Sequence, residues 1–319
     1  MDQPLLLLSL RKSCYSLNHN VDICMKKRIC IRTDRGRDAV DGAGVRLRRV
    51  LGLKTIQQYD PFLMLDGFDS TDPDDYTRGF PWHPHRGIET VTYLVEGSIE
   101  HMDSLGNKGT IGNLQCQWMT AGSGIIHQEM PKASPRMLGC QLWVNLPAIE
   151  KMTIPTYRDI LQEDVPVVNS DGAVVRVLSG SFKGHKGPMD GGFREVQYLD
   201  VTLAPNTWWE SDQTPNSHTL FFYLLDGKLQ AEGLDSFETK GCAMLMAPAG
   251  TPKEANDMVG ALSGEEGARF LVIAGKPMHE PVSWGGPIVM NTKEELELAF
   301  RELDEGTFIK HKEPTFLIL

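Results

Sequence analysis

The sequence predicts an all-β protein made of two tandem β-barrel domains of the jelly-roll type, followed by a short C-terminal helix. Three observations favour this class. Short runs rich in β-branched and aromatic residues recur along the chain, and turns containing many of its 31 glycines and 19 prolines separate them. Helical periodicity is almost absent before residue 292. The 319 residues leave room for about two domains, each with its own core.

The expected strands follow one another at the spacing typical of barrels and sandwiches. Each is a short apolar run with turn residues on both sides. Clear examples are residues 90–95, 142–146, 174–178, 220–225 and 270–273.

An internal repeat predicts that the strands belong to two copies of one domain. The string YLVEG at 93–97 matches YLLDG at 223–227, and WMTAG at 118–122 loosely matches LMAPA at 245–249. Because the offset is similar for both pairs, we expect an N-terminal domain over 25–150 and a C-terminal domain over 151–291.

One helix is expected after the second domain, within the final segment 292–319. Thr292 and Glu295 form the pattern of a capping box, in which two side chains satisfy free amides at the start of a helix. Leu296, Ala299, Phe300 and Leu303 then form an apolar stripe. We therefore predict a helix over about 293–304.

Composition excludes several classes of protein. No apolar run approaches the roughly 20 residues that a membrane-spanning helix needs, so no membrane contact is expected. The net charge is −10. Residues 1–54 carry 12 basic and 5 acidic side chains, which leaves 20 basic and 37 acidic ones for the rest. An acidic body argues against direct binding to nucleic acid.

Residues 1–24 are expected to form a disordered tail ahead of the first domain. Arg11 and Lys12 follow the leucine run instead of preceding it, which disfavours a secretory signal, and acidic residues disfavour a mitochondrial presequence. The six cysteines show no CxxC spacing, so we expect reduced thiols. The cytoplasm is the first expectation for localisation and the nucleus the second.

Two short segments carry the residues that predict chemistry. FPWHPHRGIET at 80–90 contains His83 and His85, and GSGIIHQEM at 122–130 contains His127 and Glu129. Side chains two residues apart on a strand point to the same face, so each segment offers a pair of ligands. If the two strands are neighbours, three imidazoles and one carboxylate converge.

Such a ligand set indicates a metal centre with open positions. Mixed nitrogen and oxygen ligands suit several divalent metals, namely Fe(II), Mn, Ni, Cu, Co or Zn, and four protein ligands leave room for water, dioxygen or substrate. Glu89 is a rival for the carboxylate ligand, or a hydrogen-bond partner of a ligand histidine. His101 lies outside the paired pattern and is not expected to be a ligand.

The two segments resemble the two motifs of cupins, and the exact strings are similar to those of the pirin family. The likeness runs from about Val45 to Asn291 and includes QLWVNL at 141–146 and PIVMN at 287–291. It implies a two-domain cupin, a bicupin, whose N-terminal barrel holds one metal, usually iron. The ligands that it implies are His83, His85, His127 and Glu129.

The resemblance implies that only the first domain binds metal. At the repeat offsets, the positions that correspond to the four ligands are Gln213, Pro215, Glu254 and Asn256, which do not reproduce the ligand set. We expect the second domain to support and partly cover the first.

Two functions follow from the resemblance. The first is a quercetin 2,3-dioxygenase, which opens flavonols with dioxygen; Glu129 would serve as ligand and as catalytic base toward a substrate hydroxyl. The second is a non-enzymatic redox-responsive regulator that binds a protein partner, either a transcription factor or a metabolic enzyme. Phe80, Trp82, Trp118, Met119 and Met130 flank the ligands and are candidates for lining a pocket for a small aromatic substrate.

Overall fold

The first half of the described chain consists of two facing β-sheets. A computed structural model describes residues 27–212, 214–248 and 258–311. The larger sheet has the strand order β12-β9-β6-β11-β4-β3-β2, and the smaller one has the order β5-β10-β7-β8. In sequence order these strands are β2 (Arg37–Asp41), β3 (Val45–Leu51), β4 (Phe62–Ser70), β5 (Phe80–His85), β6 (Ile88–Glu96), β7 (Ile99–Asp103), β8 (Lys108–Ile111), β9 (Gln115–Thr120), β10 (Ile125–Pro131), β11 (Met137–Asn145) and β12 (Thr156–Ile160).

The second half is built around one nine-stranded sheet with the central order β1-β21-β19-β22-β17-β14-β13. Two further strands, β18 and β20, pair with β22 and β19. The strands are β1 (Cys30–Arg35), β13 (Val167–Ser170), β14 (Ala173–Ser179), β17 (Gln197–Leu203), β18 (Trp208–Ser211), β19 (Thr219–Ala231), β20 (Glu238–Thr239), β21 (Cys242–Met246) and β22 (Val259–Gly275). Strands β15 (Ser181–Phe182) and β16 (His185–Lys186) form a small separate ladder.

These sheets confirm the predicted fold class, two tandem all-β domains with a C-terminal helix. Within the described residues the hydrogen-bonded ladders remain open sheets that face one another in the manner of a jelly roll, and they do not close into a continuous barrel. The C-terminal helix α2 (Lys293–Asp304) begins at the capping box of Thr292 and Glu295, as predicted. A short helix, α1 (Ile56–Tyr59), was not expected.

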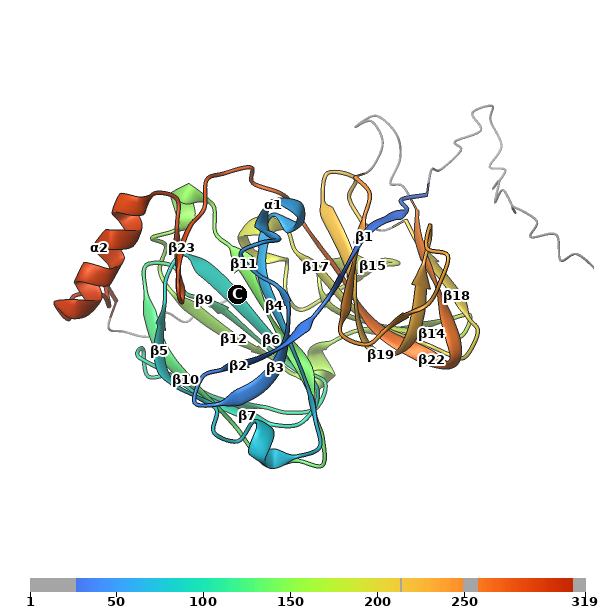
Figure 1. Cartoon of the computed structure of the whole chain (residues 1–319), viewed down its shortest axis with the longest axis horizontal. Helices are drawn as coiled ribbons and strands as arrows, with labels where there is room; N and C mark the ends of the chain where they lie inside the picture. The colour runs from blue at the N-terminus through green and yellow to red at the C-terminus, as the bar shows by residue number, and fades with distance from the viewer. Residues whose placement is uncertain (1–26, 213, 249–257, 312–319) are drawn as a thin grey trace, which may run out of the picture.

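Three segments pack against the other half of the molecule from the one that their position in the sequence predicts. Strand β1 crosses over to pair with β21 of the second half (Figure 1). Strand β12, which follows residue 150, pairs with β9 of the first half. The hairpin of β23 (Ser283–Gly285) and β24 (Ile288–Met290) returns with α2 to the first half (Figure 1). The sheets therefore interleave across the predicted boundary at residue 150.

The two large sheets pack face to face and share one hydrophobic core. On β6, Val91, Tyr93 and Val95 belong to this shared core, together with Phe221 and Ile273 of the second half. The intervening residues of β6 face the space between the two sheets of the first half, because side chains alternate along a strand. One face of β6 thus holds the halves together, while the other is available to a site.

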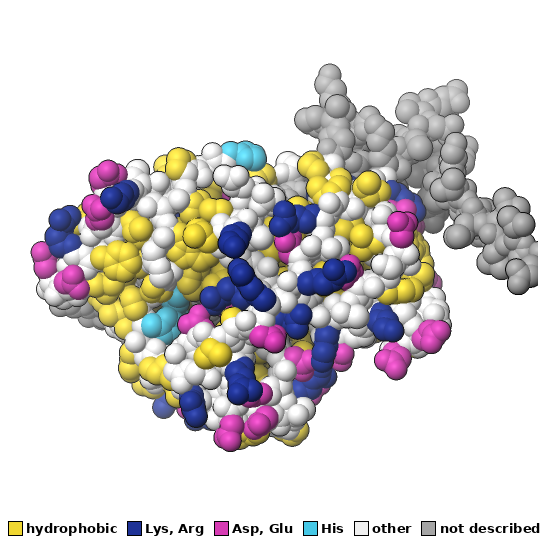
Figure 2. Space-filling view, in the orientation of Figure 1, with side chains coloured by type: hydrophobic (Ala, Val, Ile, Leu, Met, Phe, Trp, Pro, Cys, Tyr) yellow, Lys and Arg dark blue, Asp and Glu magenta, His cyan; other side chains and the backbone are white. Residues whose placement is uncertain are grey.

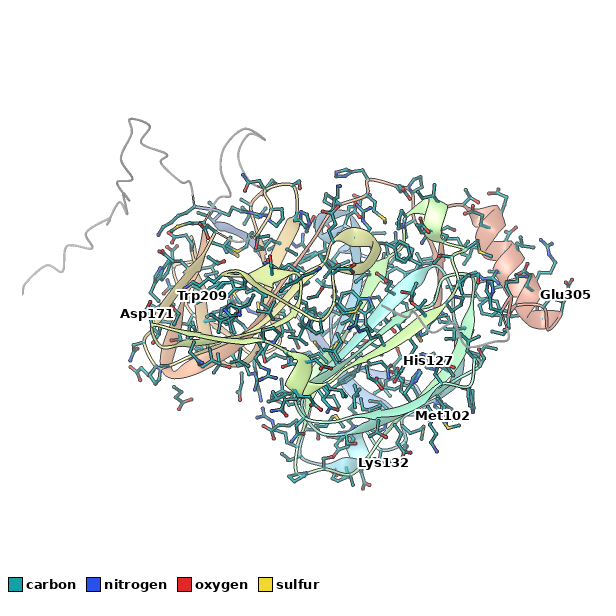
Figure 3. All side chains as sticks on the ribbon, turned by 180° about the vertical axis from the view of Figure 1, so that it is seen from behind. Met102, His127, Lys132, Asp171, Trp209 and Glu305 are labelled. Carbon is teal, nitrogen blue, oxygen red and sulfur yellow. The ribbon has the colours of Figure 1, made fainter. Side chains whose placement is uncertain are left out.

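Aromatic side chains fill the interior of the second half. Trp209, Phe182, Phe222 and Phe270 contact one another there, with ring centroids 5.2 to 6.4 Å apart. Figure 3 shows Trp209 in this half and His127 in the other.

Some predictions fall on residues that the structure does not describe. These are the tail 1–24 and the repeat positions Gln213, Glu254 and Asn256. Among the described cysteines, Cys30, Cys116, Cys140 and Cys242 are free thiols. Neither described helix is long and apolar enough to span a membrane.

Candidate metal centre

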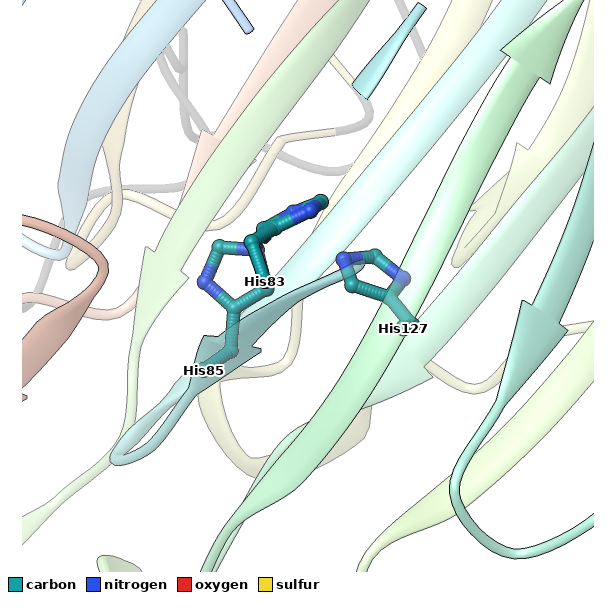
Figure 4. A group of neighbouring side chains, drawn as sticks. All are labelled: His83, His85 and His127. Carbon is teal, nitrogen blue, oxygen red and sulfur yellow. Dashed lines mark hydrogen bonds between the residues drawn. The ribbon is translucent and has the colours of Figure 1, made fainter. Parts of the chain in front are cut away.

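Two neighbouring strands bring the three predicted histidines together. Strands β5 and β10 are antiparallel, and His127 lies directly opposite His83. His85 follows two residues after His83 and therefore points to the same side. The donor atoms of the three imidazoles lie within 4.8 Å of one another. Figure 4 shows the three rings converging from their strands. Among the described residues these three side chains form the one such cluster.

The hydrogen bonds of His83 and His85 determine which ring nitrogen faces the centre. Nδ1 of His83 lies 2.9 Å from the carbonyl oxygen of Pro81, and Nδ1 of His85 lies 3.1 Å from that of Pro287. A carbonyl oxygen only accepts, so both Nδ1 atoms carry the hydrogen and both Nε2 atoms present a lone pair. These two Nε2 atoms face each other at 3.1 Å.

His127 supplies the third nitrogen from the facing strand. It is fully buried, and its Nε2 has no hydrogen-bond partner in the described part of the chain. Its Nδ1 lies 3.0 Å from Nε2 of His101. His101 is thus part of the site, although it is outside the paired sequence pattern. Only the pairing of β7 with β10 reveals it, because Glu129 stands opposite His101 in that register.

Burial keeps the imidazoles of His85 and His127 neutral. Burial, and after it the neighbouring His83, lowers the pKa of His85 to about 3. The pKa of His127 is held well below its ordinary value, first by burial and then by the three surrounding histidines. Neutral imidazole is the form that binds a metal, so no proton has to leave these rings near neutral pH.

Glu129 lies beside the histidines but not in their cluster. It lines the same pocket as His83 and His85 and is 3% exposed. Gln141 Nε2 donates to both carboxylate oxygens at 3.0 and 2.9 Å, and Thr92 Oγ1 donates to one of them at 3.2 Å. Its donor atoms are not among those that lie within 4.8 Å of one another. Its role as the fourth ligand stays a prediction.

Glu89, the rival for that role, faces away from the site. It lies on the side of β6 that carries Val91 and Tyr93, which pack in the core between the two halves. Its Oε1 accepts from Thr120 Oγ1 at 2.8 Å, while Oε2 is buried without a partner among the described residues. Burial raises the pKa of Glu89 to about 7. Between the two carboxylates, only Glu129 shares the pocket with the histidines.

A pocket of about 440 Å³ opens beside the cluster, a size suited to a small molecule. Figure 2 shows hydrophobic side chains (yellow) next to a histidine (cyan) on this face of the first half. The apolar and aromatic residues of the lining are Met64, Phe68, Phe80, Pro81, Trp143, Trp284 and Pro287.

Of the five residues proposed from sequence as pocket lining, Phe80 is the one that lines it. Trp118 packs in the core between the halves, and Met119 in a smaller core near the site. Trp82 alternates away from His83 and is 51% exposed. Met130 does not line the pocket.

An ion-pair group lies at one end of this pocket. The Arg49 guanidinium donates to both oxygens of Asp66, at 2.9 and 2.7 Å, and to Asp41 at 2.7 Å. All three residues line the pocket. Two carboxylates share one guanidinium here, so carboxylate oxygens remain that can accept hydrogen bonds from hydroxyl groups of a ligand.

The far end of the chain forms part of the pocket. Trp284 and Pro287 belong to the C-terminal segment, residues 283–309, and both line the pocket. This segment also supplies the carbonyl oxygen that fixes His85. The site therefore depends on residues that follow the second half in sequence.

Arg86 anchors the C-terminal segment from the residue next to His85. It is 1% exposed. Its guanidinium donates to the carbonyl oxygens of Ser123 at 2.7 Å and Phe308 at 2.9 Å, pairs with Glu302 at 2.8 Å, and lies 4.2 Å from the Phe308 ring centroid. Arg86 thus holds the end of α2 and the residues after it against the first half.

Lys151 anchors the same segment at the hairpin. Its buried Nζ donates to Asn145 Oδ1 and, at 2.8 Å each, to the carbonyl oxygens of Gly87 and Val289. Gly87 has a φ of 78°, and a Cβ there would collide with the Val289 carbonyl oxygen. Only glycine allows this close approach.

The donor set fits a divalent metal. Two nitrogens bound to one cation at about 2.1 Å and at right angles lie about 3.0 Å apart, close to the 3.1 Å between the Nε2 atoms of His83 and His85. The buried Nε2 of His127 also lacks a partner among the described residues, which is costly unless a ligand satisfies it. Imidazole nitrogens with an adjacent carboxylate suit iron and other first-row metals.

The facing sheets and the histidine cluster define the class of protein, a two-domain cupin with a candidate metal centre in its first domain. Residues 44–144 match the Pirin family and residues 198–309 match the Pirin C-terminal cupin domain. The chain therefore belongs to the pirin family, as the sequence motifs predicted.

Individual relatives cover most of the chain. A pirin-like protein of Caulobacter vibrioides is 41% identical over 300 residues, which span 89% of this chain and 100% of the relative. Pirin of Homo sapiens is 38% identical over 277 residues, 85% of this chain and 91% of the relative. The crystal structure of quercetin 2,3-dioxygenase from Acinetobacter baumannii matches with a TM-score of 0.78 and 30% identity, covering 88% of this chain and 98% of that one.

Proposed function

We propose that this pirin-family protein is a metal-dependent dioxygenase that opens flavonol-like aromatic substrates. The observation that carries the proposal is the pair of Nε2 lone pairs of His83 and His85 facing each other at 3.1 Å, beside the unpartnered Nε2 of His127. The likeness to a solved quercetin 2,3-dioxygenase supports the choice of reaction.

His83, His85 and His127 would hold the metal, with Glu129 as the fourth ligand and iron as the first expectation. When bound, a metal with open positions supplies Lewis acidity and the redox chemistry of dioxygen. Near neutral pH His85 and His127 can bind it without releasing protons.

The pocket would orient the substrate. Phe80, Trp143 and Trp284 offer flat apolar surfaces to a planar ring system. At the end that holds Asp41, Arg49 and Asp66, the carboxylate oxygens can accept hydrogen bonds from phenolic hydroxyl groups.

Glu129 would act as the catalytic base. Gln141 and Thr92 donate hydrogen bonds to its carboxylate and fix its orientation on the pocket wall. It can therefore take the hydroxyl proton of a flavonol on a carboxylate oxygen, which leaves the substrate as the electron-rich anion that reacts with dioxygen.

Oxygen uptake by the metal-loaded protein with quercetin tests the proposal. We expect uptake with release of one carbon monoxide per dioxygen, and a loss of at least about 100-fold in turnover for Glu129→Gln, the range of a lost general base. Metal-loaded protein that consumes no dioxygen with quercetin or other flavonols would contradict the enzymatic function and favour a regulatory role.

A further inference from the structure

His101 has an unusual place among the groups around the metal centre. His83 and His85 are each fixed at Nδ1 by a main-chain carbonyl oxygen. His127 is fixed at Nδ1 by another imidazole, whose Nε2 lies 3.0 Å away. Both rings are buried, with 0% of either residue exposed.

The direction of this hydrogen bond decides whether His127 can bind a metal. If His127 Nδ1 carries the hydrogen and donates to His101, then His127 Nε2 presents its lone pair to the centre. If His101 donates instead, His127 Nε2 carries a hydrogen and cannot act as a ligand. The direction of this hydrogen bond therefore decides whether Nε2 of His127 can bind a metal. A main-chain carbonyl oxygen can only accept, so with such a partner Nδ1 would always carry the hydrogen.

We propose that His101 is a positioning residue of the metal centre, in which its Nε2 accepts the Nδ1 hydrogen of His127 and thereby directs the Nε2 lone pair of His127 to the metal. This inference rests on the metal site of the proposed function. It names a fourth histidine that holds a ligand without itself being one.

Strand β12 holds the His101 ring in place. The ring stacks on Tyr157 with a centroid distance of 4.7 Å and an interplanar angle of 13°. Tyr157 is fixed in turn, because its hydroxyl donates to Asp159 Oδ1 at 2.6 Å and accepts from Gln117 Nε2 at 3.2 Å. Tyr157 and Asp159 belong to β12 (Thr156–Ile160), the edge strand of the larger sheet. The His101 ring is thus oriented by stacking. With Nε2 as the acceptor, the hydrogen of the neutral ring lies on Nδ1, which is buried and has no partner among the described residues.

Three variants separate positioning from simple packing. His101→Phe keeps the ring and its stacking on Tyr157 but removes the acceptor. His101→Gln restores an acceptor close to the place of Nε2. Tyr157→Phe is the control, because it loses its bonds to Asp159 and Gln117 but keeps the stacked ring.

The measurement is the affinity of the metal-free protein for Co(II), by competition with a chelator and by visible absorption. We expect His101→Phe to bind Co(II) roughly 10- to 100-fold more weakly, the usual effect of losing a partner of a metal-bound histidine. We expect the Gln variant to recover most of the affinity and the Tyr157→Phe control to stay within about three-fold of the unmodified protein.

Two outcomes would overturn the inference. One is a His101→Phe variant that binds Co(II) as tightly as the unmodified protein, and the other is a Gln variant that loses as much affinity as Phe. If the unmodified protein binds no Co(II), the metal site of the proposed function fails instead.

A second measurement needs no variant of His101. Nitrogen-15 NMR of the unmodified metal-free protein reports which ring nitrogen of each histidine carries hydrogen. We expect Nδ1–H at His127, and an Nε2–H form there would contradict the inference even if the variants do not fold.

Discussion

Nδ1 of His85 lies 3.1 Å from the carbonyl oxygen of Pro287, 202 residues later in the chain. This contact joins a candidate metal ligand of the first half to the C-terminal segment, which follows the second half. Arg86 and Lys151 hold that segment from buried positions beside the ligand strand. Metal binding and docking of the C-terminal segment should therefore depend on each other.

The first prediction concerns the anchor Arg86. Arg86→Met keeps much of the buried volume but removes the bonds to Ser123, Phe308 and Glu302. We expect the free energy of unfolding to fall by about 3 kcal/mol, because a buried ion pair is broken. We expect metal affinity to fall roughly 10-fold as the carbonyl oxygen of Pro287 loses its fixed position.

Chelator competition and urea unfolding measure both effects. Arg301→Gln, at an exposed position of the same helix, is the matched control and should change neither. An Arg86 variant with lower stability but unchanged metal affinity would show that the C-terminal segment does not support the site.

A second prediction separates the pocket wall from the surface. Trp284 lines the pocket, whereas Trp82 does not and is 51% exposed. Trp284→Ala should raise the KM for a flavonol by about 10-fold or more, since a buried aromatic contact is lost. Trp82→Ala should leave the KM within about two-fold. Equal effects of the two changes would contradict the assignment of this pocket to the substrate.

A third prediction follows from the buried carboxyl of Glu89. Its pKa is raised to about 7 from the ordinary 4.5, because burial disfavours the charged form. The unfolded chain then loses this proton at lower pH than the folded one, so Glu89 contributes stability below pH 4.5 that is lost as the pH rises to 7.

Glu89→Gln removes this dependence. The free energy of unfolding of the variant minus that of the unmodified protein should rise by about 3 kcal/mol between pH 4.5 and 7 and stay constant above pH 7. Urea unfolding of both proteins across this range checks it, and all other groups cancel in the difference. A difference in stability that is the same at pH 5 and pH 8 would show that the carboxyl is ionised in both states.

Local sequence signals predicted much of this architecture. The helix at 293–304 could be read from Thr292 and Glu295, because a capping box acts within one turn. Alternation of side chains along a strand predicted that His83 and His85 share a face. Their meeting with His127 needed one further assumption, that the two strands are neighbours, which the pairing of β5 with β10 confirms. Spacing left Glu89 open as a rival carboxylate, the family resemblance also implied Glu129, and its role as a ligand stays a prediction.

Features set by long-range packing could not be predicted. His101 is 26 residues from His127, and only the register of β7 against β10 places it at the site. The same holds for Pro287 and Trp284, which reach the pocket because the C-terminal segment folds back on the first half. Trp118 and Trp82 lie next to the ligands in sequence but do not line the pocket, because a shift of one residue along a strand reverses the face to which a side chain points.

The metal content of the purified protein tests the central claim most directly. Elemental analysis should find about one transition metal per chain in the unmodified protein and almost none in His127→Ala, because removing one of three convergent imidazoles should lower affinity severely. Circular dichroism must show that the variant keeps its β-sheet content. A folded His127→Ala variant with the same metal content as the unmodified protein would contradict this account of the site.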